Sequence, residues 1–134
     1  MENTGNTDID DPRARRFADA LQGFEQSTDP TELAALFSGE ATLSRLDARG
    51  DRDDPEAFWR EYRAQFDQLS TTFTHATESS DRVALEWSST GTLTNGRSIE
   101  YRGVTVVDFD GDEIARLRTY YDTAAFTAIP ASTA

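Results

Sequence analysis

The second half of the chain alternates apolar and polar residues, the pattern of β-strands that bury one face. Between residues 82 and 94, Val83, Leu85 and Trp87 face one way, and the other side carries Glu86, Ser88 and Thr90. Asn95-Gly96 and Asp110-Gly111 follow such runs, and these pairs suit hairpin turns that need positive φ. The sequence from about residue 71 to residue 122 therefore predicts an antiparallel meander.

The first half has helical spacing instead. Phe17, Leu21 and Phe24 form one apolar stripe at spacings of four and three, in a helix predicted to start at Pro12. "DPTELAALF" predicts a short second helix that ends at Gly39, and "ATLSRL" predicts a short strand.

A third helix is predicted after Asp54 and Pro55, a cap followed by a residue suited to the first turn. Its expected apolar face consists of three aromatic residues four apart: Phe58, Tyr62 and Phe66.

Helices followed by a meander predict an α+β domain. Because long strands twist, we expect N-terminal helices packed on a strongly curved, mostly antiparallel sheet, a cone-shaped barrel that encloses a cavity. The 134 residues suffice for one domain, which we expect to span residues 12–126. Residues 1–11 are expected to be disordered and residues 127–134 to form a tail.

The amino-acid composition limits which partners and which cellular compartment can be expected. The net charge is −12, and all thirteen basic residues are arginine, a balance that is typical of proteins adapted to high salt and that disfavours nucleic acid. Disulfides and thiolate chemistry are excluded because the chain has no cysteine. Neither a membrane-spanning run nor a signal sequence is recognisable, so we predict a cytoplasmic protein without a membrane partner.

The segment "DRVALEWSSTGTLTNGRSIEYRGVTVVDFDGDEIARLRTYYD" resembles the SnoaL-like branch of the nuclear-transport-factor-2-like superfamily. The similarity covers about residues 12–126 and rests on the "G.T" strand, the hairpin, the "GV.V..F" run and the aromatic-rich final strand. It implies a ketosteroid-isomerase-like (cystatin-like) cone, a small, largely apolar organic ligand and a homodimer formed through the outer sheet face. The superfamily includes isomerases, cyclases, epoxide hydrolases, dehydratases and non-catalytic proteins, so fold alone assigns no activity.

"LRTYYDTAAF" is similar to the C-terminal strand of limonene-epoxide hydrolases, in which the aspartate activates water. That aspartate matches Asp122. Trp87 and Ser89 stand where those enzymes have an arginine and a second aspartate, and Leu43 and Arg45 stand approximately where they have a tyrosine and an asparagine.

The cavity wall can be predicted from the same resemblance and from the aromatic positions. The expected substrate-binding residues are Phe58, Tyr62, Phe66, Trp87, Ser89, Ile99, Tyr101 and Arg118.

Asp122 is the candidate general base, because burial would raise the pKa of its carboxyl toward neutrality. His75 or Tyr120 would donate a hydrogen bond to the substrate, and such proton-transfer chemistry of the isomerase or cyclase kind needs no cofactor. Two alternatives remain open: a non-catalytic ligand-binding or dimerisation module, and a hydrolase with a rebuilt water site. Asp122 could also simply cap a turn, and His75 could be structural.

The final strand poses a conflict about which face is buried. Alternation places Ile114, Arg116, Arg118, Tyr120 and Asp122 on one face, and Ala115, Leu117, Thr119 and Tyr121 on the other. Hydrophobicity would bury the second face, whereas the resemblance would turn Asp122 inward. A bulge near Thr119 would reconcile the two.

The carboxylates of Asp47, Asp51, Asp53 and Asp54 gather in one loop. Their spacing is not that of a calcium-binding loop, and we interpret them as solvated charges rather than a metal site.

Overall fold

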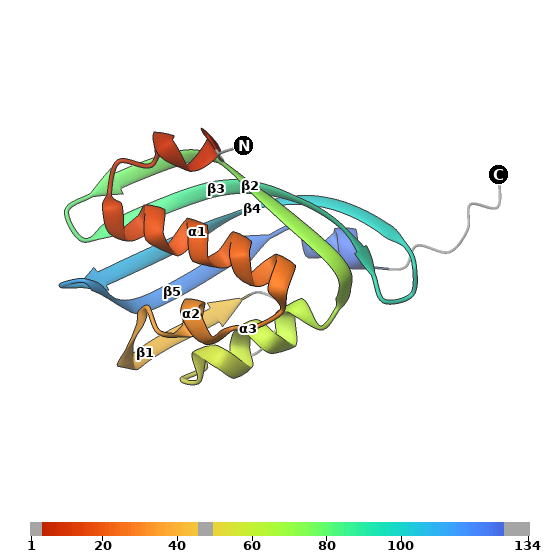
Figure 1. Cartoon of the computed structure of the whole chain (residues 1–134), viewed down its shortest axis with the longest axis horizontal. Coiled ribbons are helices and arrows are strands. Elements are labelled where there is room, and N and C mark those ends of the chain that lie inside the picture. The colour runs from red at the N-terminus through yellow and green to blue at the C-terminus, as the bar shows by residue number, and fades with distance from the viewer. Residues whose placement is uncertain (1–3, 46–49, 128–134) are drawn as a thin grey trace.

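The computed structural model describes residues 4–45 and 50–127 and contains five strands in one sheet (Figure 1). The helices are η1 (Thr4–Asp8), α1 (Pro12–Ser27), α2 (Thr31–Ala34), α3 (Pro55–Arg63) and η2 (Thr123–Phe126). The strands are β1 (Phe37–Arg45), β2 (Phe66–Ser79), β3 (Arg82–Leu93), β4 (Ser98–Asp110) and β5 (Glu113–Tyr121). The strand order is β1-β5-β4-β3-β2; β1 and β5 run parallel and the other pairs antiparallel.

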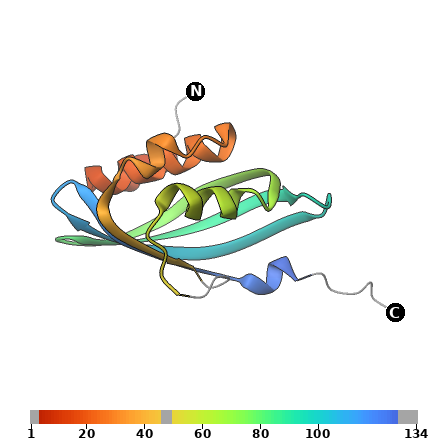
Figure 2. The same ribbon diagram turned by 90° about the horizontal axis from the view of Figure 1, so that it is seen from below.

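The helices α1 and α3 lie on one side of the curled sheet (Figures 1 and 2). The sheet does not close, since β1 and β2 are its two edges. One core cluster fills the space between helices and sheet and includes Phe17, Leu43, Phe58, Leu85 and Leu117. The predicted α+β cone with a mostly antiparallel sheet is thus confirmed.

Local capping explains where α1 begins and ends. The Asp11 side chain accepts a hydrogen bond from the Arg13 backbone N–H, and Pro12 occupies the first turn. Thr28 ends the helix in the left-handed conformation at φ 64°.

Two predicted element boundaries are wrong. Gly39 lies inside β1 rather than at a helix end, because the strand already begins at Phe37, which pairs with Ile114 of β5. Phe66 does not extend α3, which ends at Arg63; it begins β2 and pairs with Leu93. In both cases pairing with a distant strand overrides the local pattern.

The segment expected to be disordered contains structure from Thr4 onward. Asn6 donates hydrogen bonds to Asp19 and Gln22 of α1, and Ile9 is buried in the core. The buried Asn6 and Ile9 therefore dock this otherwise polar segment against α1 and the core. Residues 1–3 and 128–134, parts of the two predicted tails, lie outside the described residues.

The orientation of β5 follows hydrophobicity. Leu117, Thr119 and Tyr121 are buried, whereas Tyr120 is exposed. The irregularity lies at Ala115, where Asp108 pairs with Arg116 but Phe109 pairs with Ile114, and not near Thr119. This bulge lets Ile114 also enter the core.

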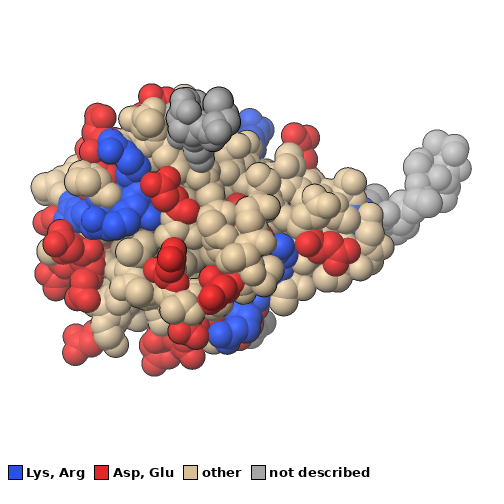
Figure 3. All heavy atoms as spheres, in the orientation of Figure 1, with Lys and Arg blue, Asp and Glu red and all other residues tan. Residues whose placement is uncertain are grey.

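Acidic side chains are spread over the face of the molecule seen in Figure 3, with arginines between them. None of the helices in the described part of the chain has the length and apolar character to cross a membrane.

Candidate ligand pocket

An inner pocket lies between α1, α3 and the inner face of the sheet. Its lining residues are Leu21, Glu25, Arg45, Phe58, Trp59, Tyr62, Thr71, Trp87, Ser89, Thr105 and Thr119. The volume is about 20 Å³, room for about one water molecule. Aromatic side chains thus fill most of the cone, and an organic ligand requires some of them to move.

Glu25 is the carboxyl group among the residues that line this pocket. Its side chain is only 2% exposed, and it accepts hydrogen bonds from the backbone N–H and the hydroxyl of Thr71. Burial raises the pKa of Glu25 to about 7; the Thr71 hydrogen bonds and the charge of Arg63 lower it by less. The carboxyl group therefore titrates near neutral pH, which suits a general base.

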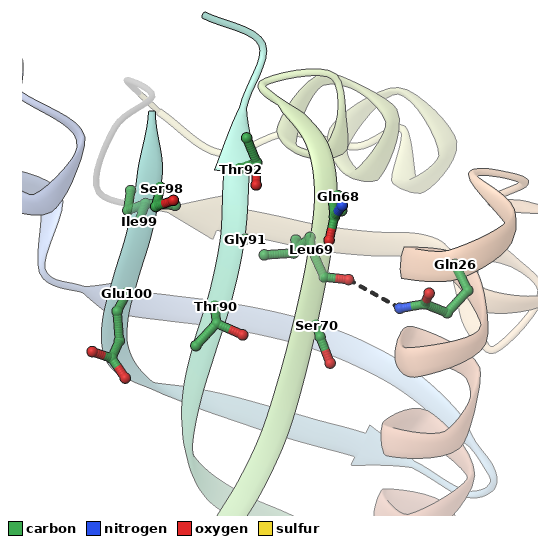
Figure 4. Close-up of a pocket in the computed structure, with 10 residues that line it drawn as sticks. All are labelled: Gln26, Gln68, Leu69, Ser70, Thr90, Gly91, Thr92, Ser98, Ile99 and Glu100. Carbon is green, nitrogen blue, oxygen red and sulfur yellow. Dashed lines mark hydrogen bonds between the residues drawn. The ribbon is translucent and has the colours of Figure 1, made fainter. Parts of the chain in front are cut away.

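Glu25 lies in the pocket because α1 runs along the edge strand β2 and contacts its backbone. The side chains of Gln22 and Gln26 donate to the carbonyls of Thr71 and Leu69, both at 3.0 Å, while Glu25 accepts from the Thr71 N–H. Figure 4 shows the Gln26 contact. Polar groups of α1 thus satisfy backbone groups on the free edge of β2.

Hydroxyl groups on four neighbouring strands form the floor of the pocket. Thr71 of β2 and Ser89 of β3 face each other, with their oxygens 2.6 Å apart. Trp87 donates its indole N–H to Thr105 of β4 at 2.9 Å, and the Thr105 and Thr119 hydroxyls are 2.9 Å apart. The floor is therefore polar although the walls are aromatic.

Trp59 contributes an unused hydrogen-bond donor. Its ring lines the pocket and is 4% exposed, yet its indole N–H has no partner among the described residues. Arg45 also lines the pocket, and its guanidinium donates to the Phe58 carbonyl and lies over the Phe58 ring. A buried donor without a partner favours an acceptor on a bound molecule.

The aromatic side chains form a second layer behind the pocket. Tyr62 and Tyr101 share a hydrogen bond through their hydroxyls, and burial raises the pKa of Tyr62. Gly103 makes room for the Trp87 ring, because a Cβ there would lie 2.5 Å from a Trp87 carbon.

Most expected substrate-binding residues are brought together. The four that line the inner pocket are Phe58, Tyr62, Trp87 and Ser89. The other buried ones are Phe66 and Tyr101, in the aromatic layer, and Ile99, which also borders an outer groove.

Asp122 is not part of the pocket, contrary to the expected inward position. It is exposed and accepts a hydrogen bond from the Ala124 N–H at 3.1 Å, so it caps η2. The physical reason is that β5 ends at Tyr121, whose side chain takes the inward direction.

His75, Tyr120 and Arg118 also point away from the cavity. His75 of β2 and Tyr120 of β5 both line a groove of about 760 Å³ on the outer sheet face, together with Glu86 and Arg102, but β3 and β4 lie between their strands. Arg118 pairs with Asp108 at 3.3 Å. Strand alternation places these polar side chains on the face opposite the core.

A second groove, of about 580 Å³, crosses β2, β3 and β4 and is bordered by Gln26 (Figure 4). Its labelled residues are mainly serine, threonine and glutamine. No group of three or more potential metal ligands occurs within residues 4–45 and 50–127; Asp47 lies outside this part.

Sequence reasoning missed Glu25, although a signal was present. Glu25 follows Phe17 and Leu21 at spacings of four, so it lies on the buried stripe of α1. A carboxylate in such a stripe is rarely left without a partner.

Helices on one face of a curled, open sheet, with a pocket between them, define a protein of the nuclear-transport-factor-2-like class. The chain belongs to the SnoaL-like domain family, whose sequence profile matches residues 14–117. No functionally curated protein is similar in sequence.

Solved structures share the fold at low identity. A protein from Anabaena variabilis with this fold is 14% identical, with 93% of this chain and 96% of that one covered and a TM-score of 0.77. A ketosteroid-isomerase-like protein from Catenulispora acidiphila, in complex with trimethylamine, is 18% identical over 81% and 87%, with a TM-score of 0.73. TerC co-crystallised with polyporic acid is 14% identical over 86% and 95%, with a TM-score of 0.74.

Proposed function

We propose that this protein binds a small organic molecule in the inner pocket and that Glu25 is the general base for proton transfer on it. The observation that carries the proposal is a carboxyl group that lines the pocket, is 2% exposed and has its pKa raised to about 7. Ligands in the Catenulispora protein and in TerC are consistent with a binding role for this fold.

The proposed reaction is the movement of a proton within a carbonyl compound. Ionised Glu25 takes a proton from the carbon beside the carbonyl, and the electron pair moves onto the carbonyl oxygen. The unused Trp59 N–H donates to that oxygen as its negative charge develops. In a substrate with a carbon–carbon double bond next to that carbon, protonated Glu25 then returns the proton to the far end of the double bond. The carbonyl re-forms and the double bond moves beside it, which completes an isomerisation without net oxidation.

Proton exchange in heavy water tests the base directly. A panel of cyclic and aromatic ketones that raise the melting temperature is incubated with the protein, and loss of α-hydrogen signal is followed by NMR. We expect Glu25→Gln to slow exchange by roughly a hundredfold or more while retaining binding, because a positioned base contributes about 10²–10⁴-fold. Glu32→Gln, an exposed change on α2, is the control. Equal exchange in the two variants would refute the role of Glu25.

Water activation is a second candidate, favoured by the cavity volume. About 20 Å³ holds about one water molecule, and Glu25 is the carboxyl group beside it. Styrene oxide in ¹⁸O-labelled water is the test: labelled diol that depends on Glu25 would indicate hydrolysis. Binding without exchange or hydrolysis would leave the protein as a ligand-binding module.

We also propose that two copies pair through the outer face of the sheet. Tyr120 is 41% exposed there, and Glu86 and Arg102 line the same groove with opposite charges. Light scattering in 1 M NaCl should give twice the chain mass for the wild type and the chain mass for Tyr120→Glu. A monomeric wild type would contradict this.

A further inference from the structure

Phe126 fills a box of aromatic rings at the C-terminal end of β5. Its ring centroid lies 4.8 Å from that of Tyr101 and 5.8 Å from those of Phe66 and Tyr121. These three residues are at most 6% exposed, and each belongs to a different strand, β4, β2 or β5. The walls of this Phe126 box are therefore part of the packed sheet.

The occupant is held much less firmly than the walls. Phe126 is half-buried and belongs to η2, a single 3₁₀ turn of four residues. The backbone bonds within the turn join Ala125 to Asp122 at 3.3 Å and Thr127 to Ala124 at 3.1 Å, near the long end of the usual range. Such short turns have poor hydrogen-bond geometry, so their displacement costs little.

Arg97 places a donor beside the box. One terminal nitrogen of its guanidinium donates to the Ala125 carbonyl at 3.3 Å. Its Nε is buried and has no hydrogen-bond partner within the described part of the chain. A buried guanidinium N–H without a partner favours an acceptor oxygen, and a carboxylate satisfies it best.

We propose that the Phe126 box is a binding site for an aromatic carboxylate, whose ring replaces that of Phe126 and whose oxygens pair with Arg97. This inference shares one premise with the proposed function, namely that the protein binds a small organic ligand. Tyr62 connects the two sites: its ring contacts Phe66 and Tyr121 at 5.6 and 5.8 Å and also lines the inner pocket. A larger ligand could therefore place its ring in the box and its reactive part near Glu25.

Benzoate titration of the wild type and of Phe126→Ala tests the proposal. The titration is measured by calorimetry in 1 M NaCl. The salt screens the repulsion between the anionic benzoate and the protein's net charge of −12, because the Debye length is then about 3 Å. We expect Phe126→Ala to bind benzoate at least tenfold more tightly than the wild type. Adding Arg97→Met should remove this gain, and Glu32→Gln, an exposed change on α2, should bind as the wild type does. Equal affinity of the wild type and Phe126→Ala would overturn the proposal, as would an equal gain in Glu32→Gln.

A second measurement locates the ligand and does not depend on the variant. In the wild type at high benzoate concentration, we expect nuclear Overhauser effects from the benzoate ring to Tyr101 and Tyr121, and much weaker ones from cyclohexanecarboxylate. Their absence would overturn the proposal even if Phe126→Ala failed to fold. Glu25→Gln should leave benzoate binding unchanged. The binding proposal can therefore hold even if the proton-transfer proposal fails. Loss of benzoate binding in Glu25→Gln would contradict a site separate from the inner pocket.

Discussion

At the residue scale, Glu25 is the main finding, because a carboxyl group on the buried stripe of a helix is costly unless it is hydrogen-bonded or protonated. Thr71 provides hydrogen bonds, and the raised pKa keeps part of the population neutral at pH 7. Asp122, the residue favoured by the sequence motif, instead satisfies a backbone N–H at the start of η2.

The pH dependence of the free energy of unfolding should reveal the ionisation of Glu25. Its pKa is about 7 in the folded protein against an ordinary value of 4.5, so between these values the folded state holds a proton that the unfolded state has lost. The stabilising contribution is complete below pH 4.5 and is lost as pH rises through about 7, in total roughly 3 kcal/mol at 1.36 kcal/mol per pKa unit. Urea denaturation from pH 4.5 to 8 measures it. Glu25→Gln should lack this fall, whereas Glu32→Gln should keep it; parallel profiles for all three proteins would disprove the shift.

Gly103→Ala should destabilise the protein, by roughly 1–3 kcal/mol, because the new methyl group overlaps the Trp87 ring and the Tyr120 carbonyl, each 2.5 Å from the position that a Cβ would take. Near-ultraviolet circular dichroism and thermal unfolding should show a perturbed tryptophan and a lower melting temperature. Gly23→Ala is the matched control, since it lies in α1 with nothing within 4 Å and should stabilise by up to about 1 kcal/mol. A neutral Gly103→Ala would mean that Trp87 can readily move aside.

At the element scale, α1 acts as a cover for the sheet edge as well as a core helix. Its apolar stripe packs into the core, while Gln22, Glu25 and Gln26 bond to the backbone of β2. The same contacts that protect the edge also place the carboxyl group in the pocket. Edge protection and the candidate site are thus two results of one helix position.

The double change Gln22→Ala and Gln26→Ala should loosen β2. Two backbone carbonyls lose their partners, so we expect a loss of roughly 1–3 kcal/mol and faster hydrogen exchange along β2. Gln68→Ala, an exposed glutamine on the same strand, should change neither quantity. Unaltered exchange in the double variant would show that α1 does not protect this edge through these side chains.

At the scale of the whole molecule, the acidic surface in Figure 3 sets the response to salt. The net charge of −12 repels itself, and raising the salt from 0.1 to 1 M shortens the Debye length from about 10 Å to about 3 Å. We expect the melting temperature at pH 7 to rise over this range. Near the isoelectric point of about 4.3 the rise should be much smaller. The same rise at both pH values would assign the salt effect to something other than charge repulsion.

The sequence alone shows three features: the change from helical spacing to strand alternation, the turn residues, and a final strand that resembles that of a known family. They determined the α+β class, the positions of most strands and the residues of the aromatic wall, because helix spacing, strand alternation and turn chemistry act between neighbours in the chain. Tertiary structure decided which carboxyl group is buried. Glu25 faces the pocket because α1 lies along the free edge of β2, and Asp122 faces solvent because β5 ends one residue earlier, with Tyr121 inward. Helix spacing does place Glu25 on the buried stripe of α1, but its hydrogen-bond partner Thr71 lies 46 residues further along the chain, and pairing with β4 sets the inward direction of Tyr121. These contacts join segments far apart in the chain, so the local pattern alone did not settle which carboxyl group is buried.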